Sequence, residues 1–205
     1  MHVTDAELVS RYLEANDQRA FRELVDRHQE RIFGYLLGMV HDRQVANDLF
    51  QDTFVRAIKA MHNQRGHYQA QGRWLQWVMR IARNAALDYL RSRKRWRTTL
   101  STDDDDSDRD PVWDRLSDDA PDAAERLHRE EQAAWLNACI ERLPSEQREV
   151  LMLRHESELT FREIAELTDC SINTALGRMR YALQNLRRMM ESSKKNELAS
   201  IDYVP

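Results

Sequence analysis

Residues 72–97 read GRWLQWVMRIARNAALDYLRSRKRWR, and this basic, tryptophan-bearing stretch determines how the rest of the chain is interpreted. Side chains of an α-helix advance by about 100° per residue. On that spacing one broad arc is apolar and predicts a buried face, formed by Leu75, Val78, Met79, Ile81, Ala82, Ala85, Ala86 and Tyr89. A second arc carries Trp77 and Asn84 among Arg73, Arg80 and Arg91. Guanidinium groups neutralise phosphates and aromatic rings stack on unpaired bases, so the second arc predicts contacts with nucleic acid.

Trp74 lies at the edge of the apolar arc, where a core position and a base contact fit equally well. The alternative for the second arc is an ordinary solvated face with its tryptophan in the core. That alternative explains the grouping of Trp77 and Asn84 with three arginines less well. The sequence SRKRWR at Ser92–Arg97 extends the cationic track beyond the helix.

The net charge of −4 conceals a segregation of charge along the chain. Residues 73–97 contain eight arginines and lysines and the single Asp88, a net charge of +7. Residues 98–125 contain eleven acidic residues against two arginines, a net charge of −9, and we expect this aperiodic segment to be a flexible linker. One hypothesis is that Asp103–Asp106 screen the basic helix from stray DNA in the free protein. The alternative is a linker that only adds solubility.

Composition and periodicity predict an all-α protein. The chain has only 5 glycines and 4 prolines, apolar residues recur three and four apart, and no strand-length window alternates. No apolar run is long enough to cross a membrane, and the N-terminus lacks the pattern of a signal peptide, so we expect a cytoplasmic protein without membrane insertion. Cys139 and Cys170 stand apart from any metal-binding pattern and are expected to be reduced packing residues.

The pattern predicts two small helical domains. Residues 1–97 form the first, beginning at a capping box of Thr4 and Glu7. Residues 98–125 form the acidic linker, residues 126–191 form the second domain, and residues 192–205 are expected to be a disordered tail.

The second domain contains the pattern of a helix-turn-helix. Thr160 and Glu163 form another capping box, Asp169 lies where a turn favours a positive φ, and Ser171 can cap the next helix. The second helix is expected to bury a stripe of Ile172, Ala175, Met179, Ala182 and Leu186, and to present the remaining side chains of its N-terminal half to a major groove. A plain helical hairpin is the alternative for this segment alone.

Two sets of motifs, in this order, resemble the extracytoplasmic-function (ECF) sigma factors of bacterial RNA polymerase, within the sigma-70 family. The resemblance covers roughly Leu8–Arg97 and Arg126–Met190. It is carried by DLFQDTFVRA at Asp48–Ala57, by WLQWVMRIARN at Trp74–Asn84 with Asp88–Arg91, and by FREIA at Phe161–Ala165 after Leu143-Pro144.

The resemblance implies a transcription initiation factor that binds core RNA polymerase and directs it to promoters. Residues expected to contact the polymerase β′ clamp helices are Asp48, Leu49, Gln51, Asp52 and Phe54, and the β flap is a further expected partner. Residues expected to hold the melted minus-ten element are Tyr68, Trp74, Trp77, Arg80, Arg83, Asn84, Arg91, Arg93, Lys94 and Arg95. Residues expected at the minus-thirty-five element are Thr160, Arg162, Asn173, Thr174, Gly177, Arg178, Arg180 and Tyr181. The family also implies control by an anti-sigma factor.

The chain departs from the family pattern in two places. The loop of residues 62–72 is about four residues longer than usual, so Tyr68 completes the base pocket only if the insertion precedes it. In the recognition helix, Leu176 and Gly177 replace the usual basic residue and serine, while Tyr181 and Leu183 replace arginines. The family's minus-thirty-five specificity therefore does not transfer to this sequence.

Two other classes of protein compete with this interpretation. A helix-turn-helix regulator that binds duplex DNA without polymerase would leave the residue 48–54 motif and the Trp77 arc unexplained. An enzyme would need a placed nucleophile, a phosphate-binding glycine loop or a metal site, and none is apparent, His62 with His67 being the only close histidine pair. We therefore expect no catalytic residues, no metal and no cofactor.

Overall fold

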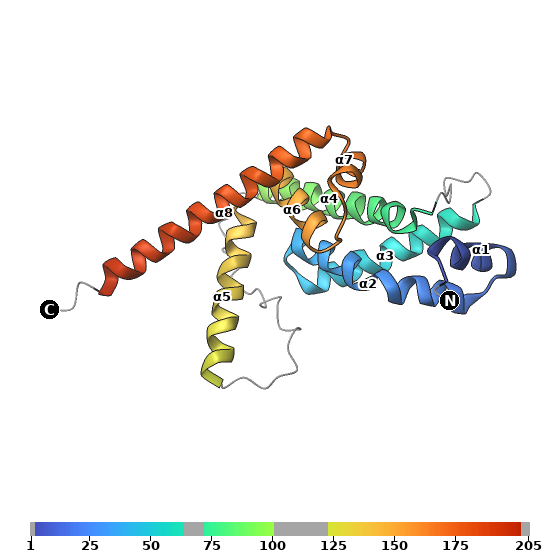
Figure 1. The fold of residues 1–205 in the computed structure, drawn as a ribbon, viewed down its shortest axis with the longest axis horizontal. Helices are drawn as coiled ribbons and strands as arrows, with labels where there is room; N and C mark the ends of the chain where they lie inside the picture. The colour runs from blue at the N-terminus through green and yellow to red at the C-terminus, as the bar shows by residue number, and fades with distance from the viewer. Residues whose placement is uncertain (1–2, 64–71, 101–122, 202–205) are drawn as a thin grey trace. The chain divides into compact units, whose positions relative to one another are not determined.

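The computed structural model describes residues 3–63, 72–100 and 123–201, with side chains described for 3–63, 72–96 and 131–192 (Figure 1). The regular elements in these ranges are all α-helices, which confirms the predicted fold class. Contacts divide the chain into two compact units, one containing α1 to α4 and the other containing α5 to α8, except that residues 155–158, at and after the end of α6, group with the first. None of the described helices has the length and apolar character needed to cross a membrane.

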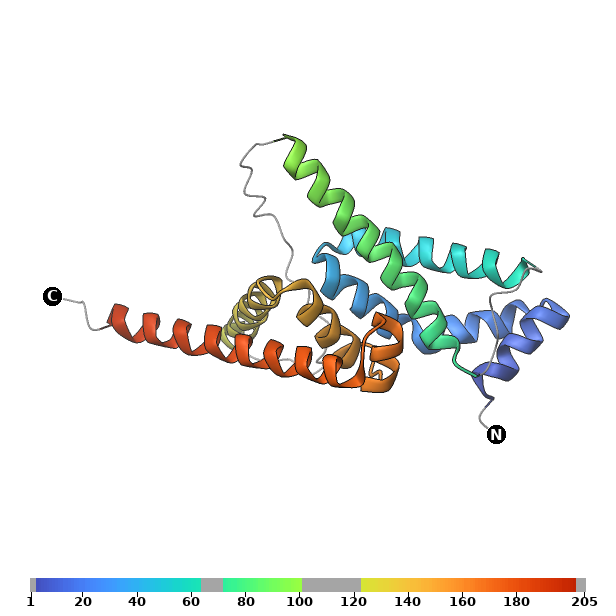
Figure 2. The ribbon, with the colours of Figure 1, turned by 90° about the horizontal axis from the view of Figure 1, so that it is seen from above.

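The first unit is built around α2. It consists of α1 (Asp5–Ala15), α2 (Gln18–Val40), α3 (Arg43–His62) and α4 (Trp74–Leu100). α2 contacts the other three helices, and α4 also contacts α3. Figure 2 shows α4 crossing α2 and α3 within this unit. Because α2 and α4 each bury one apolar stripe, the opposite face of α4 remains available to solvent.

Local signals set the helix ends of the first unit. Thr4 and Glu7 form the predicted capping box, and the side chains of Asp17 and Asp42 accept hydrogen bonds from the first turns of α2 and α3. Asn16 and His41 follow α1 and α2 in the left-handed conformation, which redirects the chain without a glycine. Polar caps therefore satisfy backbone donors that the helices leave unpaired.

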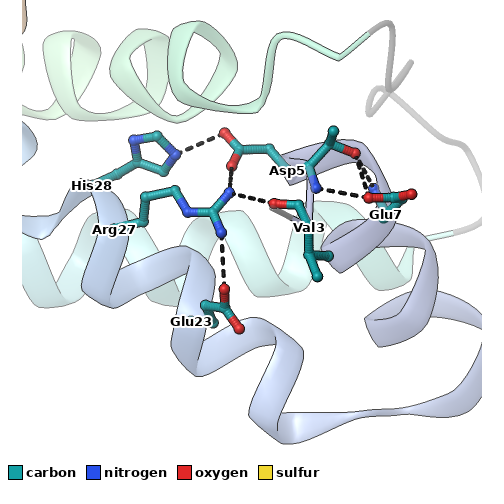
Figure 3. A network of polar contacts seen from close by, with 7 residues as sticks. Val3, Asp5, Glu7, Glu23, Arg27 and His28 are labelled. Atoms are coloured by element: carbon teal, nitrogen blue, oxygen red, sulfur yellow. Dashed lines mark hydrogen bonds and ion pairs between the residues drawn. The ribbon is translucent and has the colours of Figure 1, made fainter. Parts of the chain in front are cut away.

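A polar network fixes α1 against α2 at the N-terminal end of the unit (Figure 3). The two carboxylate oxygens of Asp5 lie 2.7 Å from Nη1 of Arg27 and 2.7 Å from Nε2 of His28. The same guanidinium donates to the carbonyl of Val3 at 3.0 Å and to Glu23 at 2.8 Å. His28 is almost fully buried, and its pKa is lowered, chiefly by burial; Asp5 acts to raise the pKa, and Arg31 and Arg27 lower it further.

The second unit consists of α5 (Ala123–Glu141), α6 (Ser145–His155), α7 (Phe161–Thr168) and α8 (Ile172–Ile201). α8 contacts α5 and α7. The buried side chains of this unit are mainly aliphatic and include Val150, Leu153, Ile164, Ala175 and Ala182. Asn185 of α8 also donates to Gln147 of α6 at 2.8 Å.

Several predicted boundaries shift. α4 continues to Leu100 and α5 begins at Ala123, so the ends of the expected linker are helical. α8 continues to Ile201, so the residues expected to form a disordered tail are mostly helical, because nothing between Ser192 and Ile201 breaks the helix. Asp103–Asp106 lie outside the described residues, and the exact domain limits stay a prediction.

Candidate nucleic-acid interfaces

The outward side of α4 is the first candidate interface. Trp77 is half-buried, while Arg80, Asn84 and Arg91 are exposed. With about 100° per residue, the arginine and asparagine side chains that project within roughly 60° of Trp77 are Arg73, Arg80, Asn84, Arg91 and Arg95. We call Trp77 and these five residues the α4 strip; Ile81 and Asp88 project to the same side of the helix. From Trp77 to Arg95 it runs about 27 Å along the helix, long enough for several nucleotides.

Not all of the cationic charge predicted for this helix lies on the strip. Arg83 and Arg93 are half-buried and Lys94 is exposed, and all three project to other sides of α4. Within the strip, Arg91 forms an ion pair with Asp88 at 3.1 Å. Both side chains of that pair are well exposed, so the pair contributes little to stability and exchanges readily with a phosphate.

Trp74 does not lie on the accessible side of α4, which corrects the expectation that it contacts DNA. Its side chain is 0% exposed. Its ring lies 5.4 Å from the ring of His28 and 6.4 Å from that of Phe54, centroid to centroid. The first turn of α4 thus points its indole into the core, because Trp74 precedes Trp77 by three residues and lies on the side of Val78.

Sequence reasoning gave Trp96 no role of its own, and the structure leaves it 68% exposed. The signal was present in SRKRWR, but the helix was not expected to continue far enough to place the residue. On a continuous α4, Trp96 projects about 100° away from Trp77, so it lies beside the strip rather than on it.

The N-terminal half of α3 forms a mixed acidic and apolar surface. Asp48 and Gln51 are exposed, and Leu49 and Asp52 are half-buried. Asp52 forms an ion pair with Arg56 at 2.7 Å. The predicted members of this surface are therefore accessible, with the exception of Phe54.

Phe54 is 8% exposed, which corrects its assignment as a surface contact. Its ring packs 4.8 Å from Phe50 and 6.4 Å from Phe21, within the aromatic core of the unit. The exposed apolar side chain is Val55, which is 46% exposed and was missed. The sequence spacing could have identified Val55, because it follows Asp48 by seven residues and Gln51 by four and therefore lies on the same face of α3.

The helix-turn-helix forms as predicted. Thr160 caps α7 in a capping box with Glu163, and Asp169 ends α7 with a φ of 54°. The hydroxyl of Ser171 accepts from the backbone N–H of Thr174 at 3.0 Å and so caps α8. The hydroxyl of Thr160 is engaged with Glu163 at 2.7 Å, which limits its capacity for other contacts.

The outward face of α8 is the second candidate interface. Ala175, Ala182 and Leu186 are buried, and opposite them project Asn173, Gly177, Arg180 and Gln184, which we call the α8 face. Thr174 and Tyr181 are exposed, Arg178 is half-buried, and Arg162 of α7 is exposed. Ile172 is 42% exposed and Met179 half-buried, so the expected buried stripe is narrower than predicted, since Ile172 begins the helix and has no preceding turn to cover it.

A shallow apolar groove flanks the α8 face. Its apolar lining comes from Phe161 of α7 and from Leu176, Met179 and Leu183 of α8, and its polar lining from Arg180, Gln184 and Arg187. Leu176 and Leu183 are among the most exposed leucines of the described residues. The guanidinium of Arg154 lies 5.6 Å from the ring centroid of Phe161.

Two further predictions concern residues outside these faces. Both cysteines are free, as expected, and burial raises the pKa of the Cys139 thiol. Within the described ranges, no group of three His, Cys, Asp or Glu side chains is placed to hold a metal ion. Tyr68 and His67 lie outside the described residues.

Comparisons with known proteins match both units. The family model for sigma-70 region 2 matches residues 24–96, and that for sigma-70 region 4 matches residues 133–186. The RNA polymerase sigma-H factor of Pseudomonas aeruginosa is 30% identical over 188 residues, which cover 91% of this chain and 94% of that protein. The ECF RNA polymerase sigma-E factor of Haemophilus influenzae is 28% identical over 177 residues, covering 86% and 90% of the two chains.

Solved structures share the fold. The sigma factor RpoE from Bartonella quintana, in complex with the anti-sigma factor NepR, matches with a TM-score of 0.64 and 17% identity over 83% of this chain and 96% of that one. CnrH, in complex with the cytosolic domain of CnrY, matches with a TM-score of 0.66 and 22% identity over 92% and 97% of the two chains.

Proposed function

This chain belongs to the ECF group of the sigma-70 family, and we propose that its α4 strip captures unpaired promoter bases while its α8 face holds duplex DNA upstream. It is a transcription initiation factor of RNA polymerase. The observation that carries the proposal is the strip itself, where an accessible indole and an amide stand among four arginines on one side of one helix.

The chemistry of the α4 strip suits melted DNA. Stacking of a base on an aromatic ring contributes about 1–3 kcal/mol, and arginines bind the phosphates of the same strand. Removing a base from the duplex stack costs a few kcal/mol. Capture by Trp77 and Asn84, together with attachment to the polymerase, offsets that cost. Promoter opening by this route requires no catalytic residue in the chain.

The surface of α3 suits attachment to the polymerase. We assign it Asp48, Leu49, Gln51, Asp52 and Val55, and we place the β′ clamp helices of core RNA polymerase against it. Carboxylates at the rim favour a basic partner, and the two aliphatic side chains provide area to bury. Phe54 supports this surface from beneath. The second unit completes the attachment through the β flap.

The α8 face suits the major groove of duplex DNA. In helix-turn-helix proteins the N-terminal residues of the second helix contact base edges, and arginines nearby hold phosphates. Asn173, Arg180 and Gln184 supply amide and guanidinium groups for bases, while Arg162 and Arg178 lie beside them for the backbone.

Two solved structures with a similar fold contain a second protein, which supports control of this chain by a protein partner. RpoE matches this chain in a structure that contains the anti-sigma factor NepR, and CnrH matches it in a structure that contains the cytosolic domain of CnrY. We place this chain under an anti-sigma factor that covers its polymerase-binding surfaces, acting in the cytoplasm where polymerase works.

The test is promoter opening by polymerase reconstituted with the full chain. Trp77→Ala combined with Asn84→Ala should leave binding to core polymerase unchanged and remove the permanganate reactivity of unpaired thymines near the start site. Trp96→Ala is the matched control, because it removes an indole that is more exposed than that of Trp77 from another side of α4 and should leave opening intact.

Unchanged permanganate reactivity in the double variant would contradict the assignment of the α4 strip. A failure of the wild-type chain to compete with another sigma factor for core polymerase would instead indicate a regulator that binds duplex DNA on its own.

A further inference from the structure

Leu176 is an aliphatic side chain in a region where DNA-reading helices carry polar groups. We propose that Leu176 recognises the 5-methyl group of a thymine in the upstream promoter element, and so sets one position of its sequence. The inference rests on the proposed function, because it requires α8 to lie in the major groove of that element.

The position of Leu176 on α8 places it within reach of base edges. It is the fifth residue of α8, in the N-terminal part that enters the groove in helix-turn-helix proteins. The side opposite Ala175, Ala182 and Leu186 faces outward, and Leu176 projects about 80° from that direction. Its side chain is nevertheless 44% exposed, so it forms one flank of the α8 face.

The surroundings hold Leu176 without burying it. Phe161, Met179 and Leu183 line the groove beside it, so one side of the leucine has apolar neighbours. The other side is open to solvent. Covering that remaining apolar surface on DNA binding would be favourable, since transfer of apolar area from water drives association.

Gly177 gives a base pair room to approach. A Cβ added at this position would meet no atom within 4 Å, so the space beside Leu176 is open. The glycine is therefore not required by packing inside the unit. Without a side chain between Leu176 and Arg178, the edge of a base pair can lie closer to the helix backbone than a larger residue would allow.

Base chemistry then selects the partner. In the major groove only thymine offers a methyl group, while the other bases offer donors and acceptors alone. Asn173 and Arg180 suit adenine and guanine through paired hydrogen bonds. The side chain of Leu176 has no hydrogen-bond donor or acceptor. A purine or cytosine edge placed against it would therefore lose its bound water without gaining a hydrogen bond in return.

The experiment uses holoenzyme assembled from the full chain and core polymerase. Random duplex DNA is first selected for binding, and each thymine of the enriched upstream element is then replaced, one at a time, by deoxyuridine, which lacks only the methyl group. At one thymine the replacement should weaken binding by about fourfold, the ratio expected for one buried methyl group. In Leu176→Ala the same replacement should have almost no effect.

Leu183→Ala is the matched control, because it removes a leucine of similar exposure from the same groove two turns further along α8. It should keep the deoxyuridine effect of the wild type. Thermal unfolding of both variants should match the wild type, since both side chains are on the surface.

The inference is overturned if no thymine responds to loss of its methyl group, or if Leu176→Ala responds as strongly as the wild type. It is also overturned if both leucine variants weaken binding of core polymerase equally while thymine methyls have no effect, which would assign the groove to a protein. If the holoenzyme enriches no upstream sequence, the proposed role of α8 fails and this inference with it. Enrichment without methyl dependence removes this inference alone.

Discussion

The α4 strip and the α8 face both combine arginine with an amide, yet they differ at their centres. The strip has a half-buried indole at Trp77. The α8 face has Gly177 at its centre, where no atom lies within 4 Å of an added Cβ. A rigid ring offers a stacking surface to a base that has left its helix, whereas a flat face admits an intact base pair. This difference supports the proposal that α4 holds single-stranded DNA and α8 holds duplex DNA.

The largest expected effect concerns Trp74, the tryptophan that does not belong to the strip. Trp74→Ala should lower the free energy of unfolding of the first unit by about 3–5 kcal/mol, because it removes a fully buried indole from between His28 and Phe54. Urea unfolding followed by circular dichroism checks this value. Trp77→Ala should cost less than about 1.5 kcal/mol in the same assay, since its ring is only half-buried. Equal losses would erase the distinction between core and strip on α4.

A smaller effect tests whether the unit that contains the α4 strip and the unit that contains the α8 face unfold independently of each other. Thr4→Ala and Thr160→Ala each remove the hydroxyl of a capping box, which costs about 1 kcal/mol. Hydrogen exchange should report faster opening of α1 in the first variant and of α7 in the second, with the other unit unchanged. Exchange that rises in both units of either variant would show that the two faces depend on one shared core.

The smallest effect is a pH dependence confined to the unit that carries α4. Burial holds the pKa of His28 below its ordinary value of 6.5, so the unfolded chain binds the proton more tightly than the folded one. Stability from this group is complete above about pH 7 and falls as the pH drops through 6.5 toward the lowered pKa. The groups facing His28 are Asp5, Arg27 and Arg31.

The unfolding midpoint of the first unit should therefore decrease between pH 7.5 and pH 5.5, and His28→Gln should make that decrease smaller. Glu7 and Asp17 have lowered pKa values, so their contributions are lost only as the pH falls below their ordinary values of 4.5 and 3.8. They leave this pH window unaffected. A midpoint that falls equally with His28→Gln would assign the pH dependence to other groups.

Much of the fold followed from the sequence because its signals are local. Capping residues such as Thr4, Thr160 and Asp169 act within one turn, and their positions predicted helix ends that the structure confirms. The predicted end of α8 was wrong, because no residue from Ser192 to Ile201 breaks a helix and a polar composition alone does not end one. Boundaries without a breaking residue depend on length and packing, which a sequence states only weakly.

The candidate faces were predicted less completely, because exposure depends on tertiary packing. Trp74 and Trp77 have the same chemistry three residues apart, and only the position of α2 and α3 decides which one is buried. For the same reason Phe54, which was expected at the surface, is buried, while Val55, to which the sequence assigned no contact, is exposed. Angular position predicted the correct side of each helix but did not say how far a neighbouring helix extends over it.

The most direct test of the difference between the α4 strip and the α8 face compares two variants on two DNAs. Holoenzyme carrying Trp77→Ala should bind a single-stranded non-template oligonucleotide about fivefold or more weakly, and bind an upstream duplex as the wild type does. Holoenzyme carrying Arg180→Ala should show the reverse, with about fivefold or more lost on the duplex alone. Equal losses on both DNAs for either variant would contradict the division of single-stranded and duplex binding between α4 and α8.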